Sequence, residues 1–152
     1  NITASISRGS LFGEAFVCAG IPYLPVDIVA AEDCTVMFLN GKTLLNTCDN
    51  GCKFHHTLVR NLLGIVAQNN MYLNQKIKYT SRKTTREKLM TYLNDQAKMK
   101  GSNDFTIPFN RQELADYLGV ERSAMSAELG KLTKLGILRT QRSHFTLLKP
   151  ID

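Results

Sequence analysis

The stretch that decides the fold is NRQELADYLGVERSAMSAEL, residues 110–129. It predicts two short helices with a glycine between them. Leu114, Ala115 and Leu118 recur at helical spacing and give the first helix an apolar face. Gly119 supplies the turn, because a residue without a Cβ adopts positive φ at little cost. The pattern is typical of a helix-turn-helix, in which the second helix enters the major groove of DNA.

The second helix is predicted to begin at residue 122 and to present one polar face. The side chains expected to face the core are Ala124, Met125 and Leu129. Those left on the outer face are Arg122, Ser123 and Ser126. An arginine there can donate two hydrogen bonds to guanine O6 and N7, so we expect these three residues to contact DNA. The alternative is a helical hairpin that only packs against its own domain.

A short β-hairpin is predicted over residues 139–147, after Gly136 ends the second helix. The apolar residues expected to pack back on the helices are Ile137, Leu138, Phe145 and Leu147. The tip contains Arg142, Ser143 and His144, and a basic tip with a hydroxyl suits contact with phosphate. The module is therefore predicted to be a winged helix-turn-helix.

Charge is divided unevenly along the 152 residues, a length that allows one ordinary domain or two small ones. Residues 1–56 carry 3 Lys and Arg against 5 Asp and Glu, whereas residues 57–152 carry 16 against 8. The basic half contains the helix-turn-helix, as expected for a polyanionic partner.

No apolar run approaches the roughly 18 residues of a membrane span, so we expect no membrane partner. We find no nucleophile–base pair, paired carboxylates or phosphate-binding glycine loop, and therefore expect no enzyme.

The region before the basic half is predicted to be β-rich and to end in a long helix. Strands are expected at 2–7, 26–31 and 34–39, and residues 11–16 are expected to form a strand that runs into a loop or a single helical turn. A helix is expected to start between Asn40 and Leu45. A single helix is expected from about residue 52 to residue 79. A heptad seam runs along it: Val59, Leu63, Val66, Asn70, Leu73 and Ile77. Such a seam, with one asparagine that fixes register, predicts a two-stranded dimer interface. The alternative is a helix buried against its own domain.

A break at residues 80–83 is predicted to be a hinge. The next helix is capped by Ser81 or Thr84 and runs to about Met99, with Leu89, Met90, Leu93 and Ala97 facing inward. A short strand is expected at 105–109, after which Asn110 caps the helix-turn-helix. The predicted domains are thus 1–51 for the β region, 52–80 for the dimerisation helix and hinge, and 81–152 for the DNA-binding domain.

The whole layout resembles the Crp–Fnr family of bacterial transcription regulators, the cyclic-AMP receptor protein family. The resemblance is carried by residues 9–14, GSLFGE, and by residues 110–123, NRQELADYLGVERS. It implies an α+β protein with a jelly-roll effector domain of the cyclic-nucleotide-binding type, a long dimerisation helix and a C-terminal winged helix-turn-helix. Only the later strands of the roll are recognisable, so we expect the front half of the effector domain to be missing and the β region to be partial.

The resemblance also implies roles for individual residues. Arg111 and Gln112 would bind backbone phosphate, and Arg122 would read a base. Ser123 and Ala127 stand where the best-known member of the family has glutamate and arginine, which implies a different operator sequence.

Gly13 and Glu14 match the family's phosphate-loop glycine and ribose-binding glutamate, and are therefore the candidate effector-binding residues. However, residues 24–26, LPV, occupy the place of the phosphate-binding arginine and hydroxyl residue, and no basic residue lies between Arg8 and Lys42. A phosphate buried without a cation would be costly, so we expect no cyclic AMP and no cofactor. The effector would be another small molecule, or a redox or metal signal read by cysteines.

The four cysteines are Cys18, Cys34, Cys48 and Cys52. We expect a bacterial, cytoplasmic protein in which thiols stay reduced and no disulfide forms. The residues weighed as metal ligands are Cys48, Cys52, His55 and His56, but their spacing matches no common zinc motif and we expect no metal.

The function expected from these features is a homodimeric, sequence-specific transcription regulator. Its expected partners are a palindromic operator in double-stranded DNA, a second copy of the chain, and RNA polymerase as a candidate third. The alternative is a dimeric sensor or scaffold that does not read DNA, favoured by the loss of base-reading side chains at Ser123 and Ala127.

Overall fold

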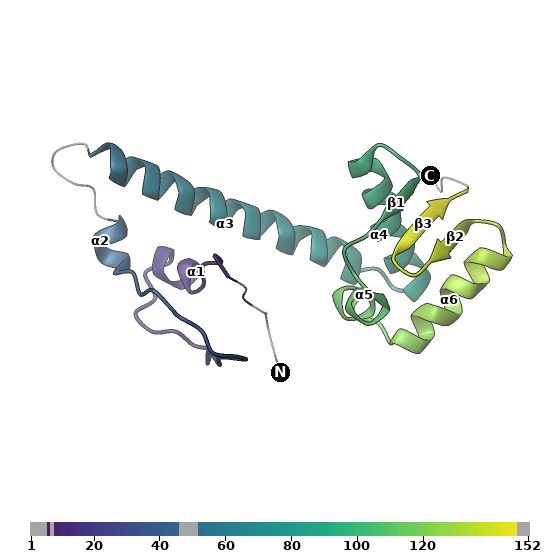
Figure 1. Cartoon of the computed structure of the whole chain (residues 1–152), viewed down its shortest axis with the longest axis horizontal. Helices are drawn as coiled ribbons and strands as arrows, with labels where there is room; N and C mark the ends of the chain where they lie inside the picture. Colours follow the sequence, from purple (N-terminus) through teal and green to yellow (C-terminus); the bar gives the residue numbers. More distant parts are fainter. Residues whose placement is uncertain (1–5, 7, 46–51, 149–152) are drawn as a thin grey trace. The chain divides into compact units, whose positions relative to one another are not determined.

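The computed structural model describes residues 6, 8–45 and 52–148 (Figure 1). The chain divides into two compact units, Asn1–Met71 and Tyr72–Asp152. Three helices begin in the first unit: α1 (Glu14–Cys18), α2 (Gly41–Leu45) and α3 (Lys53–Thr80). The second unit contains the end of α3 and then, in chain order, α4 (Thr85–Lys100), β1 (Asp104–Thr106), α5 (Arg111–Leu118), α6 (Arg122–Lys134), β2 (Leu138–Gln141) and β3 (His144–Leu147).

In the first unit, hydrogen bonds join α3 to the two short helices. His55 Nε2 lies 2.8 Å from the carbonyl oxygen of Leu44 at the end of α2. Asn69 Nδ2 donates to Glu14 Oε1 at 2.7 Å, at the start of α1. The short helices themselves pack closely, because a Cβ added at Gly41 would lie 2.3 Å from Val17 Cγ1. The helix predicted at residues 40–45 is confirmed as α2, and the long helix is confirmed as α3.

The strands predicted before residue 40 are wrong wherever the structure describes them. Residues 11–13, 26–31 and 34–39 belong to no strand, whereas the helical turn expected after residue 11 is present as α1. Val29 and Phe38 in these segments are 84% and 90% exposed. Alternating apolar residues indicate an extended chain, but a strand also requires a hydrogen-bonded neighbour, and none is found among residues 8–45. A jelly-roll is therefore not shown; the strand predicted at 2–7 lies almost entirely outside the described residues.

The second unit is a winged helix-turn-helix, as predicted. Its three strands form an antiparallel sheet in the order β1-β3-β2. Phe145 in the middle strand pairs with Phe105 on one side and Thr140 on the other. One core joins the sheet to the helices: Leu89, Leu93, Leu114, Leu118, Met125, Leu132, Leu138 and Phe145 all have essentially no exposed surface. The fold class is thus α+β, rich in helix, with one small sheet.

The helix ends are set by the capping residues in the sequence. Thr84, one of the two predicted caps, accepts a hydrogen bond from the Glu87 N–H, and the Glu87 side chain accepts from the Thr84 N–H, forming a capping box. Asn110 and Glu113 form the same arrangement at α5. Gly119 then ends α5 with φ of 60°, in the left-handed region. These three local signals determine where the helix-turn-helix begins and turns.

One residue of the second helix was placed wrongly. Ala124 was expected to face the core but is exposed. The buried residues of α6 are Met125, Leu129 and Leu132, spaced by four and three. At about 100° per residue, Ala124 lies well to one side of that stripe. Met125 and Leu129 alone already place Ala124 about 100° or more from the buried side chains, so its apolar character by itself was not evidence that it faces the core.

An aromatic cluster attaches the last turns of α3 to the second unit. Tyr79 is 1% exposed, and its ring lies edge-on to Tyr92 with centroids 5.4 Å apart. The rings of Tyr72 and Tyr79 also lie within 5.9 and 6.1 Å of Tyr117 in α5. Burial raises the pKa of the Tyr79 phenol, and the Asp95 carboxylate raises it further. The second unit accordingly starts at Tyr72, ahead of the break where a hinge was predicted.

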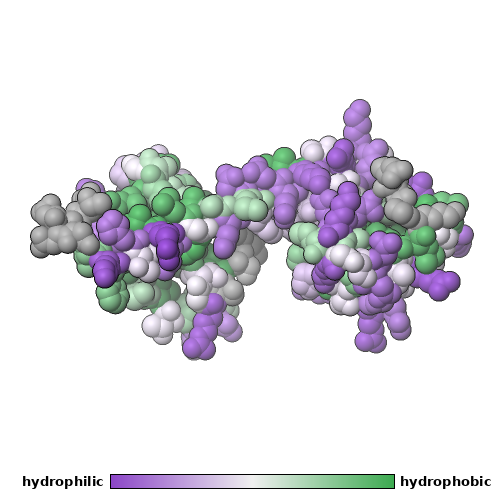
Figure 2. Space-filling view, turned by 90° about the horizontal axis from the view of Figure 1, so that it is seen from above, coloured by the Kyte–Doolittle hydropathy of each residue, from purple (hydrophilic) through white to green (hydrophobic). Residues whose placement is uncertain are grey.

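The surface differs between the two units. Figure 2 shows hydrophobic surface gathered on residues before Met71, whereas the winged domain presents mainly polar surface. The large apolar side chains exposed in the first unit include Tyr23, Val29, Met37, Phe38 and Phe54. Among the helices described here, none is at once long and apolar enough to cross a membrane.

We predict opposite effects of alanine at two glycines of the helix-turn-helix. Gly119→Ala should lower the free energy of unfolding by about 1–2 kcal/mol, because an L-residue is strained in the left-handed region. Gly130→Ala, inside α6 where an added Cβ meets no atom within 4 Å, should raise it by about 0.5–1 kcal/mol. Urea unfolding of both variants checks this, and effects of the same sign would contradict the assigned turn.

Candidate nucleic-acid interface

The polar face of α6 is exposed to solvent. Met125, Leu129 and Leu132 fix the opposite face in the core. Arg122, Ser123 and Ser126, the residues predicted to meet DNA, are all exposed. They lie within the first five residues of the helix, so they are gathered at its N-terminal end. In a helix-turn-helix this is the end that reaches base edges.

The N-terminus of α6 is left open, unlike those of α4 and α5. Its N-cap, Glu121, makes no side-chain cap hydrogen bond, and the first turn contains no acidic residue. The first backbone N–H groups of a helix have no partner within the helix, and the helix dipole makes this end positive. A phosphate oxygen is a suitable acceptor there. Arg122 and Ser123 occupy the same turn, so the backbone donors and the predicted base-reading side chains are adjacent.

Arg142 is the second exposed cation of the predicted site. It lies in the two-residue turn between β2 and β3 with φ of 53°, in the left-handed region. An arginine in this conformation costs about 1–2 kcal/mol relative to glycine. Within residues 52–148, neither Arg142 nor Arg122 has a hydrogen-bond or ion-pair partner. Both guanidinium groups are therefore available to an outside acceptor.

Arg111, in contrast, is bound within the domain. Its Nη2 donates to Thr140 Oγ1 at 2.6 Å, and its Cζ lies 5.1 Å from the centroid of the Phe145 ring. Nη1 is buried without a partner among the described residues, and burial lowers the pKa of the guanidinium. Gln112 likewise donates from Nε2 to Asp116 Oδ1 at 2.9 Å. Arg111 thus ties the start of α5 to the sheet, a use that the sequence did not indicate.

The other two residues of the predicted tip also have partners. Ser143 Oγ donates to the carbonyl oxygen of Phe109 at 2.9 Å. His144 Nε2 lies 2.8 Å from Asp104 Oδ1, and Thr146 Oγ1 donates to Asp104 Oδ2 at 2.8 Å. The Thr146 hydrogen bond lowers the pKa of the Asp104 carboxyl, and His144 lowers it further. These contacts join β1 to β3 and hold the turn that carries Arg142.

A lysine that the sequence analysis missed supports the helix-turn-helix from α4. Lys88 Nζ donates to the carbonyl oxygen of Gly119 at 3.2 Å, across 31 residues of sequence. This carbonyl lies at the end of α5, where backbone acceptors lack helical partners. No local pattern could identify Lys88, because its acceptor is defined only by the packing of α4 against the turn.

The candidate effector and metal residues lie in the first unit. Glu14 is bound by Asn69, and Gly13 precedes α1 with φ of 79°. Cys18, Cys34 and Cys52 are exposed free thiols, while Cys48 lies outside the described residues. His55 is bound to Leu44 and His56 is exposed. No group of three or more His, Cys, Asp or Glu side chains able to hold a metal occurs in the part that the structure describes.

The predicted dimer seam is exposed along much of α3. Leu63, Leu73 and Ile77 are 63%, 55% and 62% exposed. Asn70 is exposed too, and Val59 and Val66 are partly buried. The apolar seam is therefore not covered by the chain's own described residues.

Comparison with known proteins assigns the second unit to a class. Residues 87–150 match the Crp-like helix-turn-helix domain. No curated protein matches the chain. A domain of this kind is typical of DNA-binding regulators and suggests double-stranded DNA as the partner. The match covers less than half of the chain, and for these residues it supports a regulator of the Crp–Fnr type at the level of the family.

We predict that the Asp104 contacts stabilise the fold in a pH-dependent way. The folded-state pKa of Asp104 is depressed, so its contribution is present above the unfolded-state pKa and lost as pH falls through the folded-state pKa. Asp104→Asn should be less stable than the wild type at neutral pH, with the difference shrinking below about pH 4. Urea unfolding at a series of pH values measures this, with Asp116→Asn as the control. A difference that grows on acidification would contradict it.

Proposed function

We propose that the chain is a homodimeric, sequence-specific DNA-binding transcription regulator controlled by an effector other than cyclic AMP. The observation that carries the proposal is the free polar face at the open N-terminus of α6, in a domain that matches the Crp-like helix-turn-helix. Donors at that end can reach both phosphates and base edges. The core residues lie on the opposite face and leave this side of α6 available to a ligand.

The proposed DNA contacts divide into two kinds. Arg122, Ser123 and Ser126 would read base edges, since they are exposed and share one face of α6. Arg142 would contact a phosphate from the tip of the wing, together with Ser143 and His144 if their internal hydrogen bonds are exchanged for phosphate. Arg111 and Gln112 would support the phosphate contact chiefly by holding α5 against the sheet, given the partners that each already has.

Dimerisation through α3 is the second part of the proposal. A soluble chain rarely leaves a row of large apolar side chains uncovered, and a second copy of the seam would cover Leu63, Leu73 and Ile77. Two copies of α6 would then have to sit about 34 Å apart to enter successive major grooves of a palindromic operator. We also propose a cytoplasmic location and contact with RNA polymerase, because the helix-turn-helix domain indicates a transcription regulator.

Effector control is proposed for the first unit. Residues 1–51 would be the remaining part of a β-roll, since large apolar side chains such as Val29 and Phe38 are exposed and would be covered by the rest of such a domain. Gly13 and Glu14 remain the proposed effector residues. The absence of any Lys or Arg between Arg8 and Lys42 argues against a cyclic nucleotide phosphate there.

We predict that Arg122→Ala reduces binding to a selected operator about 10-fold to 100-fold, because a bidentate arginine–guanine contact contributes about 1–3 kcal/mol. Random-sequence DNA should be bound nearly as well as by the wild type. Fluorescence anisotropy titrations at several salt concentrations measure both affinities, with the operator obtained by selection from a random library. The control is Arg60→Ala, which removes an equal charge from α3.

Equal losses for Arg122→Ala and Arg60→Ala would contradict base reading by α6. Affinity that hardly changes with salt would contradict phosphate binding altogether, because release of counterions makes DNA binding steeply salt-dependent. That second outcome would instead favour a dimeric sensor or scaffold.

We predict that Leu73→Arg converts the dimer to a monomer. A charge in the seam of a two-stranded coiled coil is left without water or a partner, so association should weaken by at least about 100-fold. Sedimentation velocity over a range of protein concentrations checks this. Gln75→Arg adds the same charge on the opposite side of α3 and should leave the sedimentation coefficient unchanged. A wild-type monomer at all concentrations would contradict the proposed dimer.

A further inference from the structure

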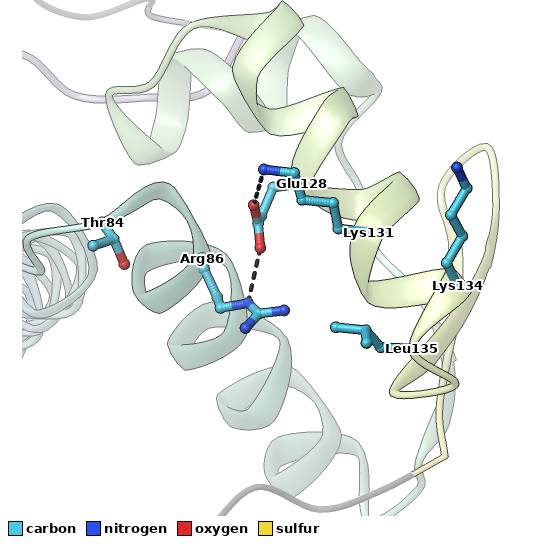
Figure 3. A pocket seen from close by; sticks show the side chains of 6 residues that line it. All are labelled: Thr84, Arg86, Glu128, Lys131, Lys134 and Leu135. Atoms are coloured by element: carbon cyan, nitrogen blue, oxygen red, sulfur yellow. Dashed lines mark hydrogen bonds and ion pairs between the residues drawn. The ribbon is translucent and has the colours of Figure 1, made fainter.

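An ion-pair triad lies between α4 and α6, away from the proposed DNA-reading face. Glu128 Oε1 accepts a hydrogen bond from Arg86 Nε at 2.8 Å, and Glu128 Oε2 lies 3.5 Å from Lys131 Nζ. Figure 3 shows the carboxylate between the two cations, with the Arg86 guanidinium reaching across from α4. Only one of the two contacts joins different helices, because Glu128 and Lys131 belong to the same turn of α6. The Arg86–Glu128 pair is therefore the directional link between α4 and α6.

Burial distinguishes this pair from an ordinary surface ion pair. The Glu128 side chain is 15% exposed, whereas that of Arg86 is 45% exposed. Exposed pairs contribute little, since water competes for both charges. A carboxylate with so little access to water depends more on its cation and loses more when the cation is removed. Glu128 is accordingly held to Arg86 with a fixed geometry.

The pair lies on a flank of α6 that borders an open groove. An open groove of about 580 Å³ separates this part of α4 from the C-terminal half of α6, lined by Thr84, Arg86, Glu128, Lys131, Lys134 and Leu135. Leu135 is the apolar side chain of that lining and is largely exposed. The flank of α6 beside the groove is thus without close apolar packing, and the charged pair spans it.

The position of Glu128 on the helix matters for rotation. At about 100° per residue, Glu128 lies on one side of the buried stripe, and Arg122 and Ser126 lie on the other side. Close packing of Met125, Leu129 and Leu132 limits rotation of the helix about its axis, and the hydrogen bond from Arg86 adds a directional constraint on the flank beside this stripe. A rotation of about 20° would shift side-chain atoms at the helix surface by about 2 Å. That shift exceeds the tolerance of a hydrogen bond to a base edge.

We propose that Glu128 and Arg86 are positioning residues that set the rotation of α6 about its own axis, and thereby the aim of Arg122 and Ser126. Neither residue contacts DNA in this role. The inference rests on the proposed function for its consequence, namely sequence specificity, but the orientation of α6 can be measured in the absence of DNA.

The first test measures specificity as the ratio of affinities for the selected operator and for random DNA. Arg86→Ala and Glu128→Ala should each lower this ratio about threefold to tenfold, and the double variant should lower it no further, because contacting residues are not additive. Lys131→Ala is the matched control, since it removes a cation from the same carboxylate without touching α4. Thermal unfolding of each variant excludes a general loss of structure.

The second test measures the orientation of α6 relative to α4 in the free protein by residual dipolar couplings of backbone amides. Glu128→Ala and Arg86→Ala should change the α6 couplings, whereas Lys131→Ala should reproduce those of the wild type. Unchanged couplings in all three variants, or additive losses of specificity in the double variant, would overturn the positioning role. A wild-type protein that prefers no DNA sequence would overturn the proposed function and the specificity role together, even with altered couplings in Glu128→Ala.

Discussion

The burial of Tyr79 is the contact on which the rest of the winged domain depends. This residue belongs to α3, yet its ring packs between Tyr92 of α4 and Tyr117 of α5. The Asp95 carboxylate interacts with its phenol and raises the pKa of that group. The adjacent Lys78 binds Asp95 at 2.5 Å. Edge-on aromatic contacts and a partly buried ion pair resist bending at the end of α3. The last turns of α3 are therefore packed as part of the winged domain, together with α4 and α5.

The domain separates its polar residues into those that hold the fold and those left for a ligand. Arg111, Ser143 and His144 each have an internal partner, and these contacts join α5, the sheet and the segment before α5. Arg122 and Arg142 have none within the described residues, and each sits where the backbone itself is unusual: an open helix end and a left-handed turn. Exposed residues with a strained backbone conformation, or with backbone N–H groups that lack an acceptor, are often found at ligand-binding sites.

The local signals in the sequence were sufficient for most of the second unit. Capping boxes at Thr84 and Asn110, the left-handed Gly119 and the apolar spacing of Leu114 and Leu118 act over a few residues, so they can be recognised without knowing the tertiary fold. The same reasoning failed before residue 40. The alternation there was genuine, but strand formation depends on a distant hydrogen-bonded partner that no local pattern specifies. Ala124 was misplaced because a small apolar residue can lie outside the buried stripe of a helix, and its angle to Met125 and Leu129 was not taken into account.

What the sequence by itself determined is the helix-turn-helix and its wing, together with the candidate face of α6. Capping, glycine conformation and helical periodicity are interactions between near neighbours in the chain, and these require no further context. Tertiary structure alone decided which cations are free, because Thr140 and Phe145 of the sheet meet Arg111 of α5, and Asp104 meets His144 on the neighbouring strand. It likewise decided that Lys88 supports the turn and that Arg86 meets Glu128, since both contacts join residues far apart in sequence that only packing brings within hydrogen-bonding distance.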